Sequence, residues 1–174
     1  PKTAWPPTSS YYYSITNQHQ EEYLVMEIER KFIPKCLPDN LDSYEHHDIQ
    51  QAYLNTSPVI RIRKQDEDYF LTYKGSGMMS REEYNLPLNQ KSYFHLLTKA
   101  DGNIITKTRY LIPLFNSLTA ELDIFHDIFD GRLLVEVEFN SIEDANSFIP
   151  PEWFGEDVTY DKKYHNSNMS KEIL

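Results

Sequence analysis

From about residue 23 onward, apolar and polar residues alternate at every second position over short runs that turn residues separate. A period of two is typical of a β-strand with one buried face. Glycine-containing turns at Gly75-Ser76-Gly77 and Asp130-Gly131 indicate hairpins. The alternation predicts eight strands, at residues 23–32, 48–54, 59–64, 69–74, 81–87, 104–112, 118–125 and 133–139.

Two stretches depart from this pattern and predict helices, at residues 89–99 and 141–148. In the second, Ser141 stands where an N-cap is expected, with acidic residues soon after it. Residues 160–174 are polar and predict a short C-terminal helix. Eight strands with short connections therefore predict an α+β protein, an eight-stranded antiparallel β-barrel with a few flanking helices. Closure of the barrel would leave no sheet edge exposed.

The first 20 residues differ in composition from the rest. They contain Pro6-Pro7 and the run Tyr11-Tyr12-Tyr13, and they include no acidic residue. We interpret residues 1–20 as an N-terminal extension outside the barrel, with an interaction segment as the alternative. The remaining residues, 21–174, fit a single domain.

Composition limits the classes of partner and compartment. A formal net charge of −10 argues against general nucleic-acid binding, although a local basic cluster can still bind a small anion. Cys36 is the only cysteine, which is typical of a reducing cytoplasm. No apolar run approaches the ~20 residues of a membrane span, and no signal-peptide pattern is present. We expect a cytoplasmic protein with neither nucleic acid nor membrane as partner.

One face of the predicted strands carries charged side chains of both signs, because residues two apart point the same way. A charged face on a single strand is usually the solvent-exposed side of a sheet. Here same-sign doublets recur, and like charges two apart repel unless a counter-ion or ligand lies between them. The set therefore predicts a charged barrel interior. Its acids are Glu27, Glu29, Glu83, Glu121, Asp123, Glu136 and Glu138, and its bases are Lys31, Arg61, Arg63, Lys74, Arg81, Lys107 and Arg109.

Equal numbers of acids and bases give this interior no net charge, so alone it could not neutralise a triphosphate. One or two divalent cations held by the acids would supply the missing positive charge. Carboxylates suit Mg²⁺ or Mn²⁺, whereas Arg and Lys suit phosphoryl oxygens. This division of roles predicts phosphoryl-transfer chemistry.

The motifs resemble those of a known family. The opening strand "MEIERKF" contains Glu-x-Glu-x-Lys, and "IRIRK", "YFLTYKGSG", "SREEYNL", "TKTRY", "ELDIF", "LVEVEF" and "FIPPEWFGEDVTYDKKYHN" follow in order. From about residue 22 to 166 the chain resembles the triphosphate tunnel metalloenzymes, or CYTH superfamily. Through "LVEVEF" and "PPEWFGEDVT" it is most similar to the short bacterial inorganic triphosphatases.

The resemblance implies a role for each matching residue. The implied reaction is metal-dependent hydrolysis of tripolyphosphate to pyrophosphate and phosphate, with Mg²⁺ or Mn²⁺ as cofactor. Lys31 and Glu83 are implied to be catalytic, Glu83 by orienting or deprotonating water. Lys162 and Tyr164 lie in a tail that is implied to fold toward the tunnel mouth. The implied metal ligands are Glu27, Glu29, Asp123, Glu136 and Glu138. The implied phosphate ligands are Lys31, Arg61, Arg63, Lys74, Arg81, Lys107, Arg109 and Lys162.

Other functions on the same fold remain open at this point. A thiamine triphosphatase and a class IV adenylate cyclase would use the same tunnel. A non-catalytic module binding polyphosphate or nucleotides would keep the basic face alone, and the acid pairs Glu27/Glu29 and Glu136/Glu138 argue against it. The sequence leaves a homodimer open.

Overall fold

The computed structural model describes residues 26–77 and 79–173. Eight antiparallel strands form a closed barrel, in the order β5-β4-β3-β2-β6-β7-β8-β1, and a pairing of β5 with β1 closes the ring. This confirms the predicted fold class. The strands are β1 (Met26–Pro34), β2 (Glu45–Thr56), β3 (Val59–Gln65), β4 (Asp68–Lys74), β5 (Ser80–Leu88), β6 (Asp101–Pro113), β7 (Thr119–Phe125) and β8 (Leu133–Glu138).

A ninth strand, β9 (Phe154–Asp157), pairs with the end of β1 and was not predicted from the sequence. The start of the first predicted strand, residues 23–25, and the extension at 1–20 lie outside the described residues. No helix within 26–77 or 79–173 is long and apolar enough to cross a membrane.

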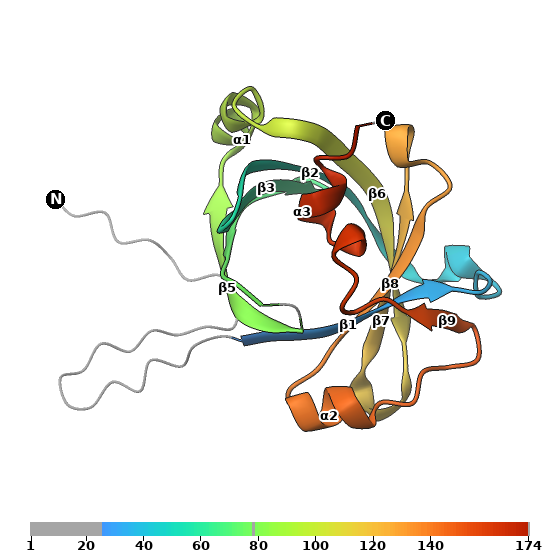
Figure 1. The fold of residues 1–174 in the computed structure, drawn as a ribbon. Helices are drawn as coiled ribbons and strands as arrows, with labels where there is room; N and C mark the ends of the chain where they lie inside the picture. Colours follow the sequence, from blue (N-terminus) through green and yellow to red (C-terminus); the bar gives the residue numbers. More distant parts are fainter. Residues whose placement is uncertain (1–25, 78, 174) are drawn as a thin grey trace, which may run out of the picture.

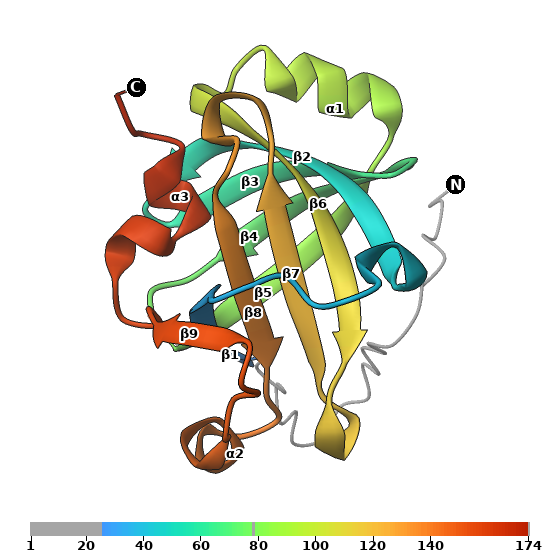
Figure 2. The same ribbon diagram turned by 90° about the vertical axis from the view of Figure 1, so that its right-hand side faces the viewer.

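Both predicted helices form, and each begins after a side-chain cap, of which the one at Ser141 was predicted. α1 (Gln90–Leu97) begins after Asn89, whose side chain accepts a hydrogen bond from Ser92 N at 2.8 Å. α2 (Ile142–Ser147) begins after Ser141, which accepts from Asp144 N at 3.0 Å. Both helices lie outside the barrel wall, on different sides of it (Figures 1 and 2).

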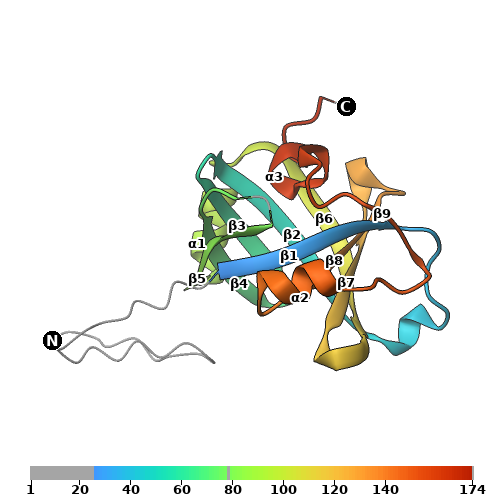
Figure 3. The ribbon, with the colours of Figure 1, turned by 60° about the horizontal axis from the view of Figure 1, so that its bottom comes forward.

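Apolar side chains point outward from the barrel and pack beneath these helices. Tyr93 of α1 packs with Ala52 and Ile62 of β2 and β3. Ala145 of α2 packs with Phe32 and the outward residues of β7 and β8, and Figure 3 shows α2 lying along β1. The hydrophobic core is thus outside the wall, which leaves the barrel interior to the charged face.

The tail after β9 folds back over one end of the barrel. It contains three 3-10 residues, Lys162–Tyr164, followed by the short helix α3 (Asn166–Met169), which confirms a short C-terminal helix. Met169 is buried with Tyr53 and Ile105, so α3 is packed against the wall. In Figure 1, α3 lies beside the opening of the barrel.

Candidate functional site: a cavity inside the barrel

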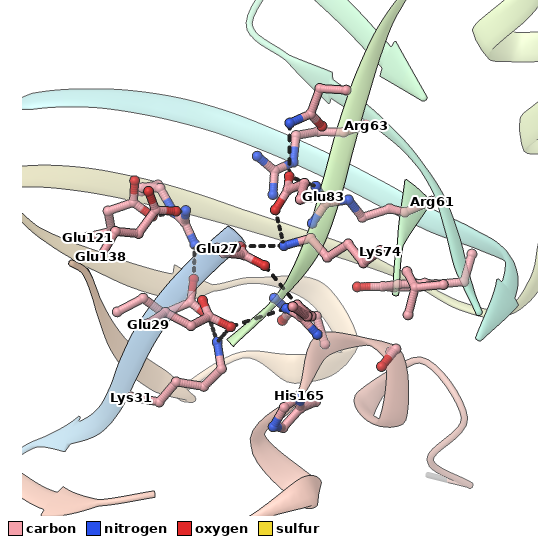
Figure 4. Close-up of a pocket in the computed structure, with 18 residues that line it drawn as sticks. Glu27, Glu29, Lys31, Arg61, Arg63, Lys74, Glu83, Glu121, Glu138 and His165 are labelled. Carbon is pink, nitrogen blue, oxygen red and sulfur yellow. Dashed lines mark hydrogen bonds and ion pairs between the residues drawn. The ribbon is translucent and has the colours of Figure 1, made fainter. Parts of the chain in front are cut away.

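The barrel interior contains a cavity of ≈ 210 Å³ with an almost entirely polar lining (Figure 4). Strands β1, β3, β4, β5, β6, β7 and β8 each contribute charged residues to it. Its acids are Glu27, Glu29, Glu83, Glu121, Glu136 and Glu138, and it has as many bases, Lys31, Arg61, Arg63, Lys74, Arg81 and Arg109. The structure therefore brings together most of the charged face expected from the alternation.

Several acids are neutralised by bases on neighbouring strands. Glu27 is bound by Lys74 Nζ at 2.5 Å and by Arg81 Nε at 2.9 Å. Burial would raise the pKa of Glu27, but Lys74 and Arg81 together hold it well below its usual range. Glu136 likewise pairs with Lys31 and Arg109, which outweigh burial and lower its pKa. These two carboxylates remain ionised inside the barrel.

Lys31 lies between two acids and stays charged. Its Nζ is 2.9 Å from Glu29 Oε1 and also pairs with Glu136, its direct partner across the β1–β8 pairing. Burial would lower the pKa of Lys31, but these two carboxylates raise it above its usual value. The residue is thus a fixed positive charge on the cavity wall.

One side of the cavity has excess negative charge. Glu29 and Glu138 are direct partners across the β1–β8 pairing, where like charges destabilise a sheet. Burial and the neighbouring carboxylates Glu121 and Glu27 raise the pKa of Glu138 to about 7. Burial also raises the pKa of Glu29, with Glu136 and Glu27 adding to the effect against Lys31. A cation placed between Glu29 and Glu138 would relieve this repulsion.

Another side of the cavity has excess positive charge. Arg61 and Arg63 lie two apart on β3, and the Nε atom of each is buried with no hydrogen-bond partner in the described part of the chain. Burial, together with the positive charges of Arg61 and Arg109, lowers the pKa of Arg63 to about 10. An anion at this position would use the free N–H donors and reduce the repulsion.

Three predicted site residues lie away from this cavity. Lys107 and Asp123 are 1% and 0% exposed, pair with each other inside the wall, and are not among the residues that line the cavity. Asp123 also holds Arg109, with Nε at 2.6 Å. Lys162 lines a second, outer cavity of ≈ 480 Å³ instead.

The structure adds lining residues that the sequence did not single out. Asn85 follows Glu83 by two positions on β5, so the alternation could have identified it. His165, Asn166 and Ser167 come from the tail, where no strand periodicity exists to indicate them. Tyr53 lines the cavity and also packs into the hydrophobic core.

The carboxylate side of this cavity fits a hard divalent cation in its donor chemistry. Within the described residues, no three His, Cys, Asp or Glu side chains converge into a ready metal site. The reason is visible in the ion pairs, because Lys and Arg now occupy most of the carboxylate oxygens. Glu138 and Glu29, with their raised pKa values, are the acids that a cation would stabilise most.

A closed antiparallel barrel with opposed acids and bases in its interior is the architecture expected of the triphosphate tunnel metalloenzymes, the class that the motifs resemble. The CYTH domain family matches residues 26–171, and the chain therefore belongs to this family. An inorganic triphosphatase of Nitrosomonas europaea is 40% identical over 84% of this chain and 98% of its own. Another from Acetivibrio thermocellus is 31% identical over 83% of this chain and 93% of its own.

A solved structure agrees with these sequence comparisons. The crystal structure of an inorganic triphosphatase is similar to this chain with a TM-score of 0.65 and 37% sequence identity, covering 84% of this chain and 95% of its own. The resemblance inferred from the motifs is thus confirmed at the level of family and fold.

Proposed function

We propose that this protein hydrolyses inorganic tripolyphosphate to pyrophosphate and phosphate inside the barrel, with a divalent cation, Mg²⁺ or Mn²⁺. The separation of charge within one cavity is the observation that carries the proposal. Glu29 and Glu138 favour a cation on one side. The Nε donors of Arg61 and Arg63, which have no partner among residues 26–77 and 79–173, favour an anion on another. A metal–triphosphate complex satisfies both sides at once. Relatives named inorganic triphosphatases support the choice of substrate.

The carboxylates of β1 and β8 would hold the metal, namely Glu27, Glu29, Glu136 and Glu138. When bound, a divalent cation supplies positive charge to the phosphoryl oxygens and helps to lower the pKa of water. Asp123 pairs with both Lys107 and Arg109, so we propose that these buried residues act mainly by fixing Arg109.

The basic residues would hold and orient the phosphate chain. Arg61 and Arg63 bind it from β3, and the fixed charge of Lys31 offsets negative charge that develops on the reacting phosphoryl group. Lys74 and Arg81 would exchange their carboxylate partners for phosphate oxygens when substrate binds. Arg109 would donate to phosphate in place of Glu121 and Glu136, while Asp123 keeps the guanidinium in position.

Glu83 is the candidate for positioning the attacking water. Its two oxygens accept from Lys74 Nζ at 2.7 Å and Asn85 Nδ2 at 2.9 Å, so the carboxylate is fixed at the cavity wall. A fixed carboxylate can orient a water molecule and accept its proton as the phosphorus–oxygen bond forms.

We further propose a cytoplasmic location, because Cys36, the only cysteine, is an exposed free thiol suited to a reducing compartment. A homodimer stays an open expectation, which sedimentation analysis would decide.

The test is phosphate release from tripolyphosphate, ATP, thiamine triphosphate and pyrophosphate, each with Mg²⁺, with Mn²⁺ and with EDTA. We expect metal-dependent release from tripolyphosphate and its loss in EDTA. Cyclic AMP formation from ATP would instead identify a cyclase. Tight binding of tripolyphosphate without release under any metal would identify a non-catalytic binding module.

A further inference from the structure

The tail that crosses one end of the barrel is fixed to it at three places. Lys31 N donates to Thr159 Oγ1 at 3.0 Å, and Val158 N donates to Lys31 O at 2.8 Å. At the other end of the tail, Asn103 N donates to Ser170 O at 2.6 Å. The buried side chain of Met169 fixes α3 between these points. Residues 159–170 therefore form a preformed part of the cavity wall.

Two neighbouring residues of this tail, His165 and Asn166, each have a buried polar atom with no hydrogen-bond partner in the described part of the chain, Nε2 and Oδ1 respectively. The Asn166 Oδ1 is an acceptor, whereas Nε2 of His165 can take up a proton and donate to an anion. His165 is 7% exposed and lines the central cavity. A hydrogen bond with the backbone of Thr159 holds the ring. Buried polar atoms without a partner are rare in folded proteins, and at a cavity wall they indicate a bound group.

The position of His165 coincides with the end of the central cavity. The outer cavity of ≈ 480 Å³ begins there, and both cavities share Val59, Arg81, His165 and Ser167 in their lining. Beyond this point the wall consists of residues 56–58, Tyr73, the turn at 75–77, Lys162 and Asn168. The imidazole ring thus stands where one binding space meets the next.

We propose that His165 ends the phosphate-binding cavity, with its Nε2 contacting the terminal phosphate of a three-phosphate chain and its ring keeping longer chains from the outer cavity. This inference rests on the proposed function and identifies the residue that limits the length of the bound phosphate chain. Arg81 and Lys162 line the outer cavity, so a fourth phosphate admitted past His165 would still meet basic residues.

The electrostatic surroundings support this contact. In the free protein, burial and the positive charges of Lys31 and Arg81 lower the pKa of His165 to about 4, against the opposing effect of Glu136, so the ring is neutral at physiological pH. A phosphate chain beside Lys31 and Arg81 offsets these charges. Nε2 can then carry a proton and donate it in a hydrogen bond to a phosphate oxygen.

The central experiment compares wild type with His165→Ala and His165→Gln on tripolyphosphate and tetrapolyphosphate. We expect His165→Ala to raise KM for tripolyphosphate about tenfold, since a hydrogen bond to a charged group is lost. We expect the tetrapolyphosphate-to-tripolyphosphate ratio of kcat/KM to rise by at least about tenfold in the same variant. His165→Gln keeps a donor near the Nε2 position and should retain most of the affinity for tripolyphosphate.

Lys171→Ala is the matched control, because Lys171 lies in the same tail with an exposed side chain and lines neither cavity. It should leave both KM and the chain-length ratio unchanged, and thermal unfolding establishes that each variant is folded. An unchanged ratio in folded His165→Ala would overturn the proposal.

Binding measured without turnover separates this inference from the proposed function. Titration calorimetry of tripolyphosphate in EDTA, repeated in two buffers of different ionisation enthalpy, should show proton uptake by wild type and its loss in His165→Gln. Equal proton uptake in wild type and His165→Gln would contradict the contact. Wild type that binds tripolyphosphate with His165-dependent proton uptake but never releases phosphate would contradict the hydrolase function alone.

Discussion

Glu29 and Glu138 are direct cross-strand partners on β1 and β8, so two carboxylates face each other on the wall of the cavity. Two residues along on the same face, the corresponding partners are Lys31 and Glu136, which form an ion pair. The same two strands thus carry one repulsive and one attractive pair. Because the two pairs differ in sign, substitutions in each can measure how much the repulsive pair lowers the stability of the folded protein.

Glu138→Gln should stabilise the metal-free protein in a pH-dependent way. The folded-state pKa of Glu138 is raised from 4.5 to about 7, so the folded protein holds this proton where the unfolded chain has lost it. Stability therefore falls as pH rises between these two values, and the loss is complete above the higher one. In EDTA, the unfolding midpoint of Glu138→Gln should exceed that of wild type at about pH 8 and match it more closely at about pH 4.

Glu136→Gln is the control for this measurement, because Lys31 and Arg109 hold the pKa of Glu136 low. Removing the negative charge of Glu136 should lower the unfolding midpoint at neutral pH. Both variants should turn over tripolyphosphate far more slowly than wild type with Mg²⁺ or Mn²⁺. Turnover of Glu138→Gln at the wild-type rate would show that Glu138 is not part of the metal site.

Lys107→Met should destabilise the protein more than it weakens substrate binding. Lys107 is fully buried beside Asp123 and does not line the cavity. Breaking a buried ion pair costs roughly 3–5 kcal/mol when a buried charge is left unpaired. Here Arg109 still neutralises Asp123, and burial lowers the pKa of Lys107 to about 8, so the loss should fall below that range. Urea unfolding measures the loss, and the KM of the folded variant measures binding.

Arg61→Ala provides the comparison, because its Nε is a free donor in the cavity. Its KM for tripolyphosphate should rise by about tenfold or more, with the stability less affected. An equal rise in KM for Lys107→Met would show that Lys107 also binds phosphate.

Truncation of the first 20 residues should leave catalysis nearly unchanged. The CYTH match begins at residue 26, and within the described residues, 26–77 and 79–173, the first to line the cavity is Glu27. The comparison is kcat/KM of the full chain and of a chain lacking residues 1–20, with thermal unfolding of both. A large loss of activity in a folded truncation would assign the aromatic run Tyr11-Tyr12-Tyr13 to the tunnel or to an interface.

Alternation along the sequence predicts which face a residue occupies, and it identified most of this cavity. It does not give the position of a residue along the barrel axis, which is why Lys107 and Asp123 share the inward face yet lie behind the lining. The alternation also does not give the register between paired strands, so the pairing of Glu29 with Glu138 could be seen only in the structure. Strand β9 is too short, at four residues after Pro150-Pro151, to show a period of two.

Substrate choice is the last prediction, and it follows from what lines the cavity. Charged groups dominate the lining, and its two aromatic rings, those of Tyr53 and His165, are both buried. The hydroxyl of Tyr53 accepts a hydrogen bond from Gln51. Recognition of a nucleobase or a thiazole ring would need accessible aromatic surfaces on which the ring can stack. Tripolyphosphate should therefore exceed ATP and thiamine triphosphate in kcat/KM by about tenfold or more, the effect of losing ~1.4 kcal/mol of transition-state binding.

Pyrophosphate should be a poor substrate, because two phosphates span less of the cavity than three, and we expect them to make fewer contacts with the acids of β1 and β8 and the arginines of β3 together. The measurement is a comparison of kcat/KM for all four compounds at saturating metal. Arg61→Ala should lower the rate with tripolyphosphate while changing the rate with pyrophosphate much less, since only the longer chain reaches β3 from the metal side. A preference for thiamine triphosphate, or equal losses for both chain lengths in Arg61→Ala, would mean that the chain lies differently in the tunnel.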